Sequence, residues 1–318
     1  MHDIAITLER VTKRYAGHTA VHALDLMIPR GSVFGLLGPN GAGKSTTIRM
    51  IMNILVPDEG RIVLFGGEPA SRDLSARIGY LPEERGLYRK MQVLEQLVFL
   101  GEVKGISRRR SRELAEQWLA RLGLSDWAAR RVEDLSKGMQ QKVQFIGALL
   151  HEPELVVLDE PFSGLDPVNS QVMKDVVVEM ARQGRTVLFS THIMEQAERM
   201  CDRVAIIARG EKLVDGKLAE VKRGSGDVHV ALAFHRNREA AARVLADRAL
   251  VARTDDYGAS AEVTLAPQAN GDALLQALVG AGVGISRFEV VEPSLQSIFI
   301  AKVGADALTA IASEVNDA

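Results

Sequence analysis

The sequence predicts an α/β fold built around a phosphate loop, followed by a smaller α+β domain. The first observation is GPNGAGKST at residues 38–46, which fits the pattern G-x-x-x-x-G-K-[ST] between the apolar run VFGLL and the helical run TTIRMIMNIL. The second is an alternation of short apolar runs with helical stretches, which is typical of a parallel sheet covered by helices. The third is a new alternation of strand and helix patterns beyond residue 226.

Length and composition limit the possible classes of protein. A chain of 318 residues exceeds the usual size of one domain, so two domains are expected. The formal charge of -2 gives no overall positive field, and we therefore expect no nucleic-acid partner. The single cysteine, Cys201, and the lack of a signal-peptide pattern favour the reducing cytoplasm. No apolar run approaches the roughly 20 residues that cross a bilayer, so another chain would supply any membrane channel.

The pattern along the chain predicts the elements and the domain boundaries. Residues 93–122 carry apolar residues at helical spacing and predict a helical insert. The segment KRGSGD at 222–227 predicts a linker. We expect a main domain at 1–225 with a helical subdomain at about 90–150, a small α+β domain at 226–303 and a tail at 304–318. Short runs of apolar and β-branched residues predict strands at 4–11, 32–37, 61–65, 155–158, 186–190 and 204–208, the last entering a hairpin at Gly210.

The phosphate loop predicts a site for a nucleoside triphosphate. Gly41 and Gly43 allow backbone N–H groups to turn toward phosphate oxygens. Lys44 reaches the β and γ phosphates, and the Ser45 hydroxyl can bind Mg²⁺. The alternative is a glycine-rich turn that opens a helix without a ligand. The other candidate binding residues of this loop are Gly38, Asn40 and Thr46.

Two acidic residues and a histidine are predicted to share the edge of the sheet with the phosphate loop. The run LVVLDEP places Asp159 and Glu160 at the carboxyl end of a buried strand, where open α/β sheets bind ligands. Asp159 is the candidate for holding Mg²⁺ through water, and Glu160 for polarising the attacking water. His192 follows the strand TVLFST, and we expect it to contact the γ phosphate.

The segment LSKGMQQK at 135–142 precedes an apolar helical run, so Ser136 is predicted to be the N-cap of a helix. A helix N-terminus that carries a serine hydroxyl and Gly138 can bind a second anion. Ordinary capping without a ligand is the alternative at this point.

Over residues 4–225 these motifs resemble the ATP-binding cassette (ABC) ATPases. GPNGAGKST resembles the Walker A motif, LVVLDEP the Walker B motif, LSKGMQQK the family signature, and His192 the switch histidine. The segment SGLDP at 163–167, with Asp166, resembles the D-loop. The resemblance implies a mixed sheet, an antiparallel β subdomain, a helical subdomain and hydrolysis of Mg-ATP.

The same resemblance implies partners and a location. Two subunits would pair head to tail, with Ser136 and Gly138 of one closing over the ATP held by Lys44 of the other. A separately encoded transmembrane permease would bind the chain at the cytoplasmic face of the cell membrane. GYLPEERGLY and VVEPSLQSIFIAKVG are similar to bacterial export ATPases of the sodium-extrusion type, which carry a small C-terminal accessory domain. The transported substrate stays open among sodium, peptides and drugs.

Tyr15 resembles the aromatic residue that stacks on adenine, although an ordinary packed aromatic is the alternative. Glu83 stands where many members of the family have glutamine; it is a candidate for sensing Mg²⁺ or nucleotide, or else a solvated loop carboxylate. The signature has Lys137 and Met139 where glycine and glutamine are common.

Two other classes of protein compete with a transport ATPase. A soluble ABC protein acting on ribosomes or DNA would usually carry a second cassette, a coiled coil or a zinc module. The other class is a phosphate-loop GTPase or small-molecule kinase. A GTPase would be expected to have an N-K-x-D motif, which the sequence lacks, and neither would have the signature or the SGLDP segment. The C-terminal region has no metal spacing, nucleophile or phosphate loop, and only regulation or a dimer contact is predicted for it.

Overall fold

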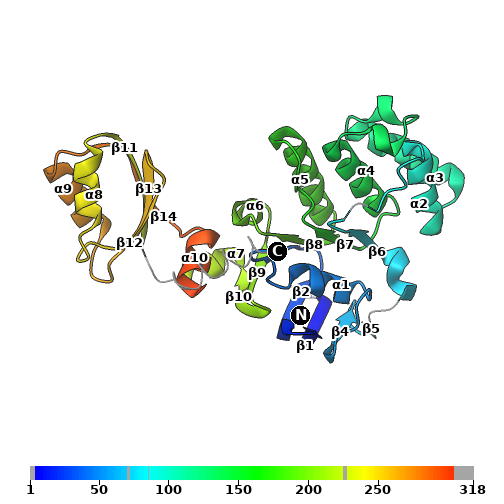
Figure 1. Ribbon diagram of the computed structural model, residues 1–318, viewed down its shortest axis with the longest axis horizontal. Coiled ribbons are helices and arrows are strands. Elements are labelled where there is room, and N and C mark those ends of the chain that lie inside the picture. Colours follow the sequence, from blue (N-terminus) through cyan, green and yellow to red (C-terminus); the bar gives the residue numbers. More distant parts are fainter. Residues whose placement is uncertain (1–3, 70–71, 85, 225–227, 304–318) are drawn as a thin grey trace. The chain divides into compact units, whose positions relative to one another are not determined.

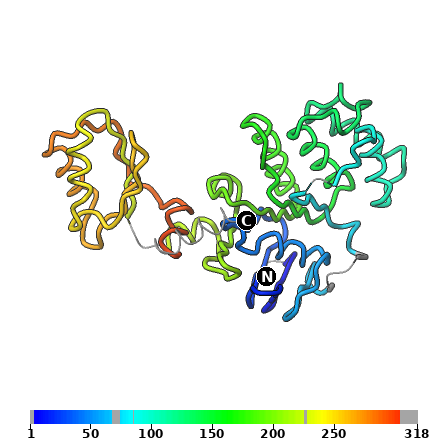
Figure 2. Tube along the Cα trace, in the orientation of Figure 1, coloured from blue at the N-terminus to red at the C-terminus, as the bar shows by residue number. Residues whose placement is uncertain are grey.

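The computed structural model describes residues 4–69, 72–84, 86–224 and 228–303, and Figure 2 traces the chain through them. These residues form two compact units. The first contains the described residues up to Leu218, together with Val303, and is called the phosphate-loop unit. The second, Ala219–Lys302, is called the accessory unit. No helix within the described ranges is both long and apolar enough to cross a membrane.

A six-stranded sheet with the order β10-β9-β3-β8-β7-β6 forms the centre of the phosphate-loop unit (Figure 1). All neighbouring strands pair in parallel except β9 and β10, which form the hairpin predicted around Gly210. Every residue of β3, β7 and β8 is buried, as expected for strands covered on both faces. The mixed sheet confirms the predicted fold class. Its strands are β3 (Val33–Leu37), β6 (Ile78–Leu81), β7 (Leu155–Asp159), β8 (Thr186–Thr191), β9 (Arg203–Ala208) and β10 (Glu211–Lys217).

A second, antiparallel sheet has the order β2-β1-β4-β5. The predicted strands did not include β2, although Leu24, Leu26 and Ile28 are buried and alternate with exposed or half-buried residues, as in a half-buried strand. Strand β1 also continues past its predicted end at residue 11, because it pairs with β2 as far as Tyr15 and His18. The strands of this sheet are β1 (Ile4–Tyr15), β2 (His18–Pro29), β4 (Glu59–Leu64) and β5 (Glu68–Pro69).

Two groups of helices complete the phosphate-loop unit. Helices α1 (Lys44–Ile51), α5 (Pro167–Arg182) and α6 (Met194–Glu198) lie against the central sheet. The helical subdomain consists of α2 (Val93–Val103), α3 (Arg108–Arg121) and α4 (Lys137–Leu149). Helices α2 and α3 approach closely at Gly101, where a Cβ would lie 2.4 Å from Ser111 Oγ. Short 3-10 turns lie at η1 (Arg72–Arg77), η2 (Ser125–Trp127) and η3 (Val132–Asp134).

The accessory unit is an α+β fold with a four-stranded antiparallel sheet of order β12-β13-β11-β14. Val230, Leu232 and Val263 of the sheet and Leu274 and Leu278 of α9 belong to its buried core. Its elements, including a helix that begins at the boundary, are α7 (Leu218–Arg223), β11 (His229–Arg236), α8 (Arg238–Leu245), β12 (Val251–Asp256), β13 (Ser260–Leu265), α9 (Gly271–Gly280), β14 (Gly284–Val291) and α10 (Leu295–Val303).

Parts of the C-terminal half differ from the sequence prediction. Strand β12 was not predicted. The first two residues of the predicted linker, Lys222 and Arg223, end helix α7 instead, because the apolar and charged run before them continues at helical spacing. Residues 225–227, at the predicted domain boundary, and the predicted tail at 304–318 lie outside the described residues.

Candidate functional site

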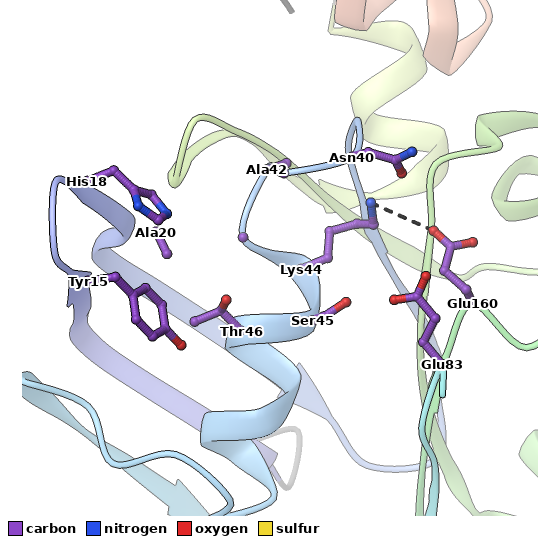
Figure 3. Close-up of a pocket in the computed structure, with 12 residues that line it drawn as sticks. Tyr15, His18, Ala20, Asn40, Ala42, Lys44, Ser45, Thr46, Glu83 and Glu160 are labelled. Carbon is purple, nitrogen blue, oxygen red and sulfur yellow. Dashed lines mark ion pairs between the residues drawn. The ribbon is translucent and has the colours of Figure 1, made fainter. Parts of the chain in front are cut away.

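The phosphate loop and residues from several other elements surround a cavity of about 280 Å³ (Figure 3). Most of the candidate site residues of the N-terminal half meet here. The lining residues are Tyr15, His18, Ala20, Asn40, Gly41, Ala42, Gly43, Lys44, Ser45, Thr46, Glu83 and Glu160.

Three glycines give the phosphate loop its shape between β3 and α1. Gly38 and Gly43 have φ angles of 154° and 103°, and a Cβ on them would lie 2.1 Å from Ile207 O and 2.3 Å from Ala20 O. Only glycine therefore fits these two close approaches. Gly41, with φ of 76°, has no atom within 4 Å of the position of a Cβ. The first N–H groups of α1 lack acceptors within the helix, so the loop can bind an anion.

Lys44 supplies a buried positive charge at this loop. Its side chain is 6% exposed, and Nζ donates to Gly38 O at 2.8 Å and to Pro39 O at 3.0 Å. Nζ also lies 3.7 Å from Glu160 Oε1. Burial lowers the pKa of Lys44, and the carboxylates of Glu160 and Asp159 oppose that shift. An ammonium has three N–H groups, so one remains for an anion in the cavity or for Glu160.

Asp159 ends β7 behind the cavity and is buried. Its Oδ1 accepts a hydrogen bond from Ser45 Oγ at 3.2 Å and a short one from Ser190 Oγ. Burial raises the pKa of Asp159, and the two hydroxyl groups oppose that shift. Ser190 was not among the predicted site residues. The sequence indicated it only as a polar residue near the end of an apolar strand. In the structure Ser190 lies opposite Asp159 in the register of β7 and β8.

Glu160 has a strained backbone that two neighbours hold in place. Its φ of 46° lies in the left-handed region, which costs a non-glycine residue on the order of 1 kcal/mol. Its N–H donates to Ser190 Oγ at 3.0 Å. Its Oε1 accepts from the backbone N–H of His192 at 3.1 Å and lies 2.9 Å from His192 Nδ1. His192 is not among the described residues that line the cavity, and its contact with the site in this structure is with Glu160.

An aromatic wall lies across the cavity from Glu160. The rings of Tyr15 and His18 are stacked, with their centroids 5.8 Å apart and an angle of 23° between their planes. Figure 3 shows both rings on the side of the β1–β2 hairpin, facing the start of α1. His18 was not among the predicted site residues, because strand β2, which begins at this residue, was not predicted.

Glu83 follows β6 and brings another carboxylate to the cavity. Figure 3 shows its side chain beside that of Glu160, below Lys44. Helix α4 fixes the backbone around it, because Gln144 Nε2 donates to Pro82 O at 3.2 Å and to Glu84 O at 3.0 Å. The loop that carries Glu83 is thus tied to the same helix as the signature motif.

The predicted second anion site does not join this cavity. Ser136 is the N-cap of α4 and accepts from Met139 N at 3.3 Å, while Asp166 is the N-cap of α5 and accepts from Asn169 N at 3.0 Å. That backbone N–H group lowers the pKa of Asp166. Ser136, Gly138 and Asp166 are absent from the described lining of the cavity.

The oxygen atoms around Ser45 suit a magnesium ion. Mg²⁺ prefers oxygen ligands at about 2.1 Å in octahedral geometry, so neighbouring ligands lie about 3 Å apart. Ser45 Oγ and Asp159 Oδ1 are 3.2 Å apart. Within the described ranges no cluster of three or more histidine, cysteine or acidic residues could hold a metal by itself. A bound Mg²⁺ would therefore need oxygens of the nucleotide in addition to oxygens of the protein such as those of Ser45 and Asp159.

Comparisons with known proteins agree with this geometry. The ABC transporter family matches residues 21–163, and the family of the DrrA1-3-like ATP-binding protein C-terminal domain matches residues 216–303. The uncharacterized ABC transporter ATP-binding protein YhaQ of Bacillus subtilis is 44% identical over 94% of this chain and 99% of its own. The Nod factor export ATP-binding protein I of a Rhizobium species is 38% identical over 68% of this chain and 72% of its own.

A solved structure shows the same fold. A dimeric ATP-binding cassette in a post-hydrolysis state, bound to ADP and phosphate, superposes with a TM-score of 0.63 at 25% identity, over 67% of this chain and 98% of its own. Family, relatives and fold agree with the phosphate loop, the paired carboxylates and the signature helix. The chain therefore belongs to the ABC transporter family, as one of its ATP-binding subunits.

Proposed function

We propose that this subunit binds Mg-ATP in the phosphate-loop cavity, hydrolyses it within a head-to-tail homodimer, and so drives a separately encoded permease that exports its substrate. The observation that carries the proposal is the meeting of Lys44 and Glu160. Both are buried, their charged atoms lie 3.7 Å apart, and both face the cavity. At such a cavity the buried positive charge can bind a phosphate, and the buried negative charge can orient the water that attacks it.

The binding roles follow from the positions of the side chains. Tyr15 offers its ring to adenine, and stacking of this kind is worth on the order of 1 kcal/mol. Lys44, Gly38, Asn40, Gly41, Gly43 and Thr46 belong to the loop and helix start that would hold the phosphates. Ser45, Asp159 and Glu83 would hold Mg²⁺, which supplies neutralisation of the charge on the transferred phosphoryl group.

The catalytic roles belong to Glu160 and His192. The Glu160 carboxylate accepts a hydrogen bond from the attacking water and so orients its oxygen toward the phosphate. His192 holds the Glu160 carboxylate through two contacts at 3.1 and 2.9 Å. Ser190 holds the backbone of Glu160 and the side chain of Asp159 together, and is therefore a positioning residue.

In the proposed head-to-tail dimer, the second anion site at the start of α4 would bind the nucleotide of the other subunit. Ser136, Gly138 and Asp166 cap or begin helices and do not line the cavity of their own subunit in the part of the chain that the structure describes. In the proposed dimer they close over the nucleotide of the other subunit. The dimeric state of the similar cassette supports this arrangement.

The direction and place of transport are further parts of the proposal. The Nod factor export protein among the relatives supports export. The subunit would bind its permease at the cytoplasmic face of the cell membrane, and no nucleic acid takes part. We further propose that the accessory unit regulates the ATPase or contributes to the dimer.

The substitution Glu160→Gln tests the chemistry. It removes the charge that orients water, and we expect the ATPase rate to fall by at least about 100-fold while Mg-ATP binding persists. Size-exclusion chromatography with Mg-ATP should then show a trapped dimer. The matched control is Glu195→Gln, since Glu195 is an exposed carboxylate in an ion pair with Arg199 and does not line the described cavity. Unchanged hydrolysis in Glu160→Gln would contradict the proposal.

A second experiment tests the partner. Tagged Glu160→Gln is purified from detergent-solubilised membranes in the presence of Mg-ATP, and the proteins that accompany it are identified by mass spectrometry. A polytopic membrane protein is the expected result. Ribosomal or DNA-binding proteins would instead favour the alternative, a soluble ABC-type ATPase that acts on ribosomes or DNA.

A further inference from the structure

The aromatic wall of the cavity consists of two rings. Tyr15 is assigned to stacking with adenine, whereas His18 has no role in the proposed function. Both side chains line the cavity. Their ring centroids are 5.8 Å apart and their planes differ by 23°, which is within the range of an interacting aromatic pair. The wall is therefore wider than the ring of Tyr15 alone.

The β1–β2 hairpin fixes the position of His18 beside Tyr15. Tyr15 ends β1, His18 begins β2, and the two residues are partners in the register of these strands. The turn between them is Ala16–Gly17, and Gly17 has a left-handed φ of 96°. Partners in an antiparallel pair carry their side chains on the same face of the sheet. Both rings therefore face the start of α1, as Figure 3 shows.

The second ring of the wall matters for the kind of base that the cavity receives. A pyrimidine has one ring, which Tyr15 alone can cover, whereas a purine has two fused rings and needs a wider surface for stacking. Tyr15 and His18 are the only aromatic residues of the described lining. Ala20 also lines the cavity, and its methyl group leaves room for a base. A wall of two rings thus fits a purine better than a pyrimidine.

We propose that His18 makes the site selective for purine nucleotides, because its imidazole stacks on the part of the base that extends beyond Tyr15. The inference rests on the proposed function, since it assumes that the cavity receives a nucleoside triphosphate. ATP and CTP carry the same triphosphate and bind the same metal. The ratio of their dissociation constants therefore isolates the contribution of the base.

The experiment measures the affinity of the full chain for Mg-ATP and for Mg-CTP by calorimetry. The readout is the dissociation constant of Mg-CTP divided by that of Mg-ATP. We expect a ratio of at least about five for the wild type, from one additional stacking contact. His18→Ala should lower the ratio by about fivefold, through weaker binding of Mg-ATP with little change for Mg-CTP. His18→Phe keeps a ring and should keep a ratio near that of the wild type.

The same strand offers a matched control. His22 is an exposed histidine of β2 that does not line the described cavity. His22→Ala removes the same side chain from the same strand, and both dissociation constants should stay unchanged. The melting temperature of each variant checks that the hairpin is still folded.

The outcomes separate this inference from the proposed function. If the wild type binds neither nucleotide, the proposed function falls and the inference with it. If the wild type binds both equally well, only the role of His18 is overturned. An equal loss of both affinities in His18→Ala also overturns it, because His18 would then only hold Tyr15 in place. A drop of the ratio in His22→Ala would overturn it too, since the effect would not be local to the cavity.

Discussion

The two units of the chain use buried polar groups in different ways. In the phosphate-loop unit, Lys44 and Glu160 are buried but face an open cavity. In the accessory unit, the buried His229 lies with Nδ1 3.6 Å from Glu262 Oε1, which also accepts from Ser297 Oγ at 3.2 Å. His229 is the first cause of the lowered pKa of Glu262. Buried polar groups that pair with one another inside a unit belong to its fold, whereas buried charges that face a cavity indicate a ligand.

The largest expected effect is on Mg-ATP affinity, and it separates a buried lysine that faces the cavity from one that does not. Lys44 faces the cavity, whereas Lys142 Nζ donates to Leu122 O at 2.9 Å inside the helical subdomain. We expect Lys44→Met to weaken Mg-ATP binding by at least about 100-fold, because charge-assisted contacts to phosphate are lost. Lys142→Met should change stability and leave the affinity nearly unchanged. Equal losses of affinity by calorimetry would remove the distinction between the two lysines.

The next prediction tests whether the two units unfold separately. Leu232 is buried in the core of the accessory unit, and Leu232→Ala should destabilise that unit by about 2–5 kcal/mol. Both tryptophans of the chain, Trp118 and Trp127, lie in the phosphate-loop unit. We therefore expect an earlier thermal transition by circular dichroism, with tryptophan fluorescence and ATP affinity unchanged. A shift of both signals together would mean that the units unfold as one.

A smaller effect concerns the acid stability of the phosphate-loop unit. Burial lowers the pKa of His151 from 6.5 to about 4, and its Nε2 lies 3.0 Å from Ile78 O. Between these values the unfolded chain binds a proton that the folded chain does not. The free energy of unfolding therefore falls as pH decreases from 6.5 toward 4. We expect a fall on the order of 2 kcal/mol, less than the full pKa shift would give, because solvent partly screens a half-buried ring.

The substitution His151→Asn should remove most of that pH dependence. The measurement is urea unfolding followed by tryptophan fluorescence at pH 7 and pH 5. The accessory unit has no tryptophan, so its own titration does not enter the signal. The same loss of stability in wild type and variant would show that another group is responsible.

The smallest effect is expected at Ser190. Its hydroxyl bonds both Asp159 and the backbone of Glu160, so Ser190→Ala should lower the ATPase rate by about tenfold and raise the Mg²⁺ concentration for half activity. The control is Ser32→Ala, which removes a serine hydroxyl that donates to Pro29 O. A lower melting temperature without a change in Mg²⁺ dependence would assign Ser190 a structural role only.

The sequence alone was sufficient to predict those parts of the site whose residues are neighbours along the chain. The phosphate loop places Gly41, Gly43, Lys44 and Ser45 within one turn, so its spacing alone predicts an anion site. The runs of β3, β7 and β8 were equally clear, because strands buried on both faces are mostly apolar. The roles of the predicted site residues, those that line the cavity included, remain predictions.

The rest required the tertiary structure. His18 and Ser190 enter the site only because β2 pairs with β1 and β8 pairs with β7, and no local pattern records which strands become neighbours. The left-handed backbone of Glu160 also depends on contacts with residues far along the chain. The sequence thus determined the phosphate loop, the α/β class and the family resemblance. Only folding decided which distant carboxylates, hydroxyl groups and rings surround the cavity, because side chains of separate strands meet through sheet pairing.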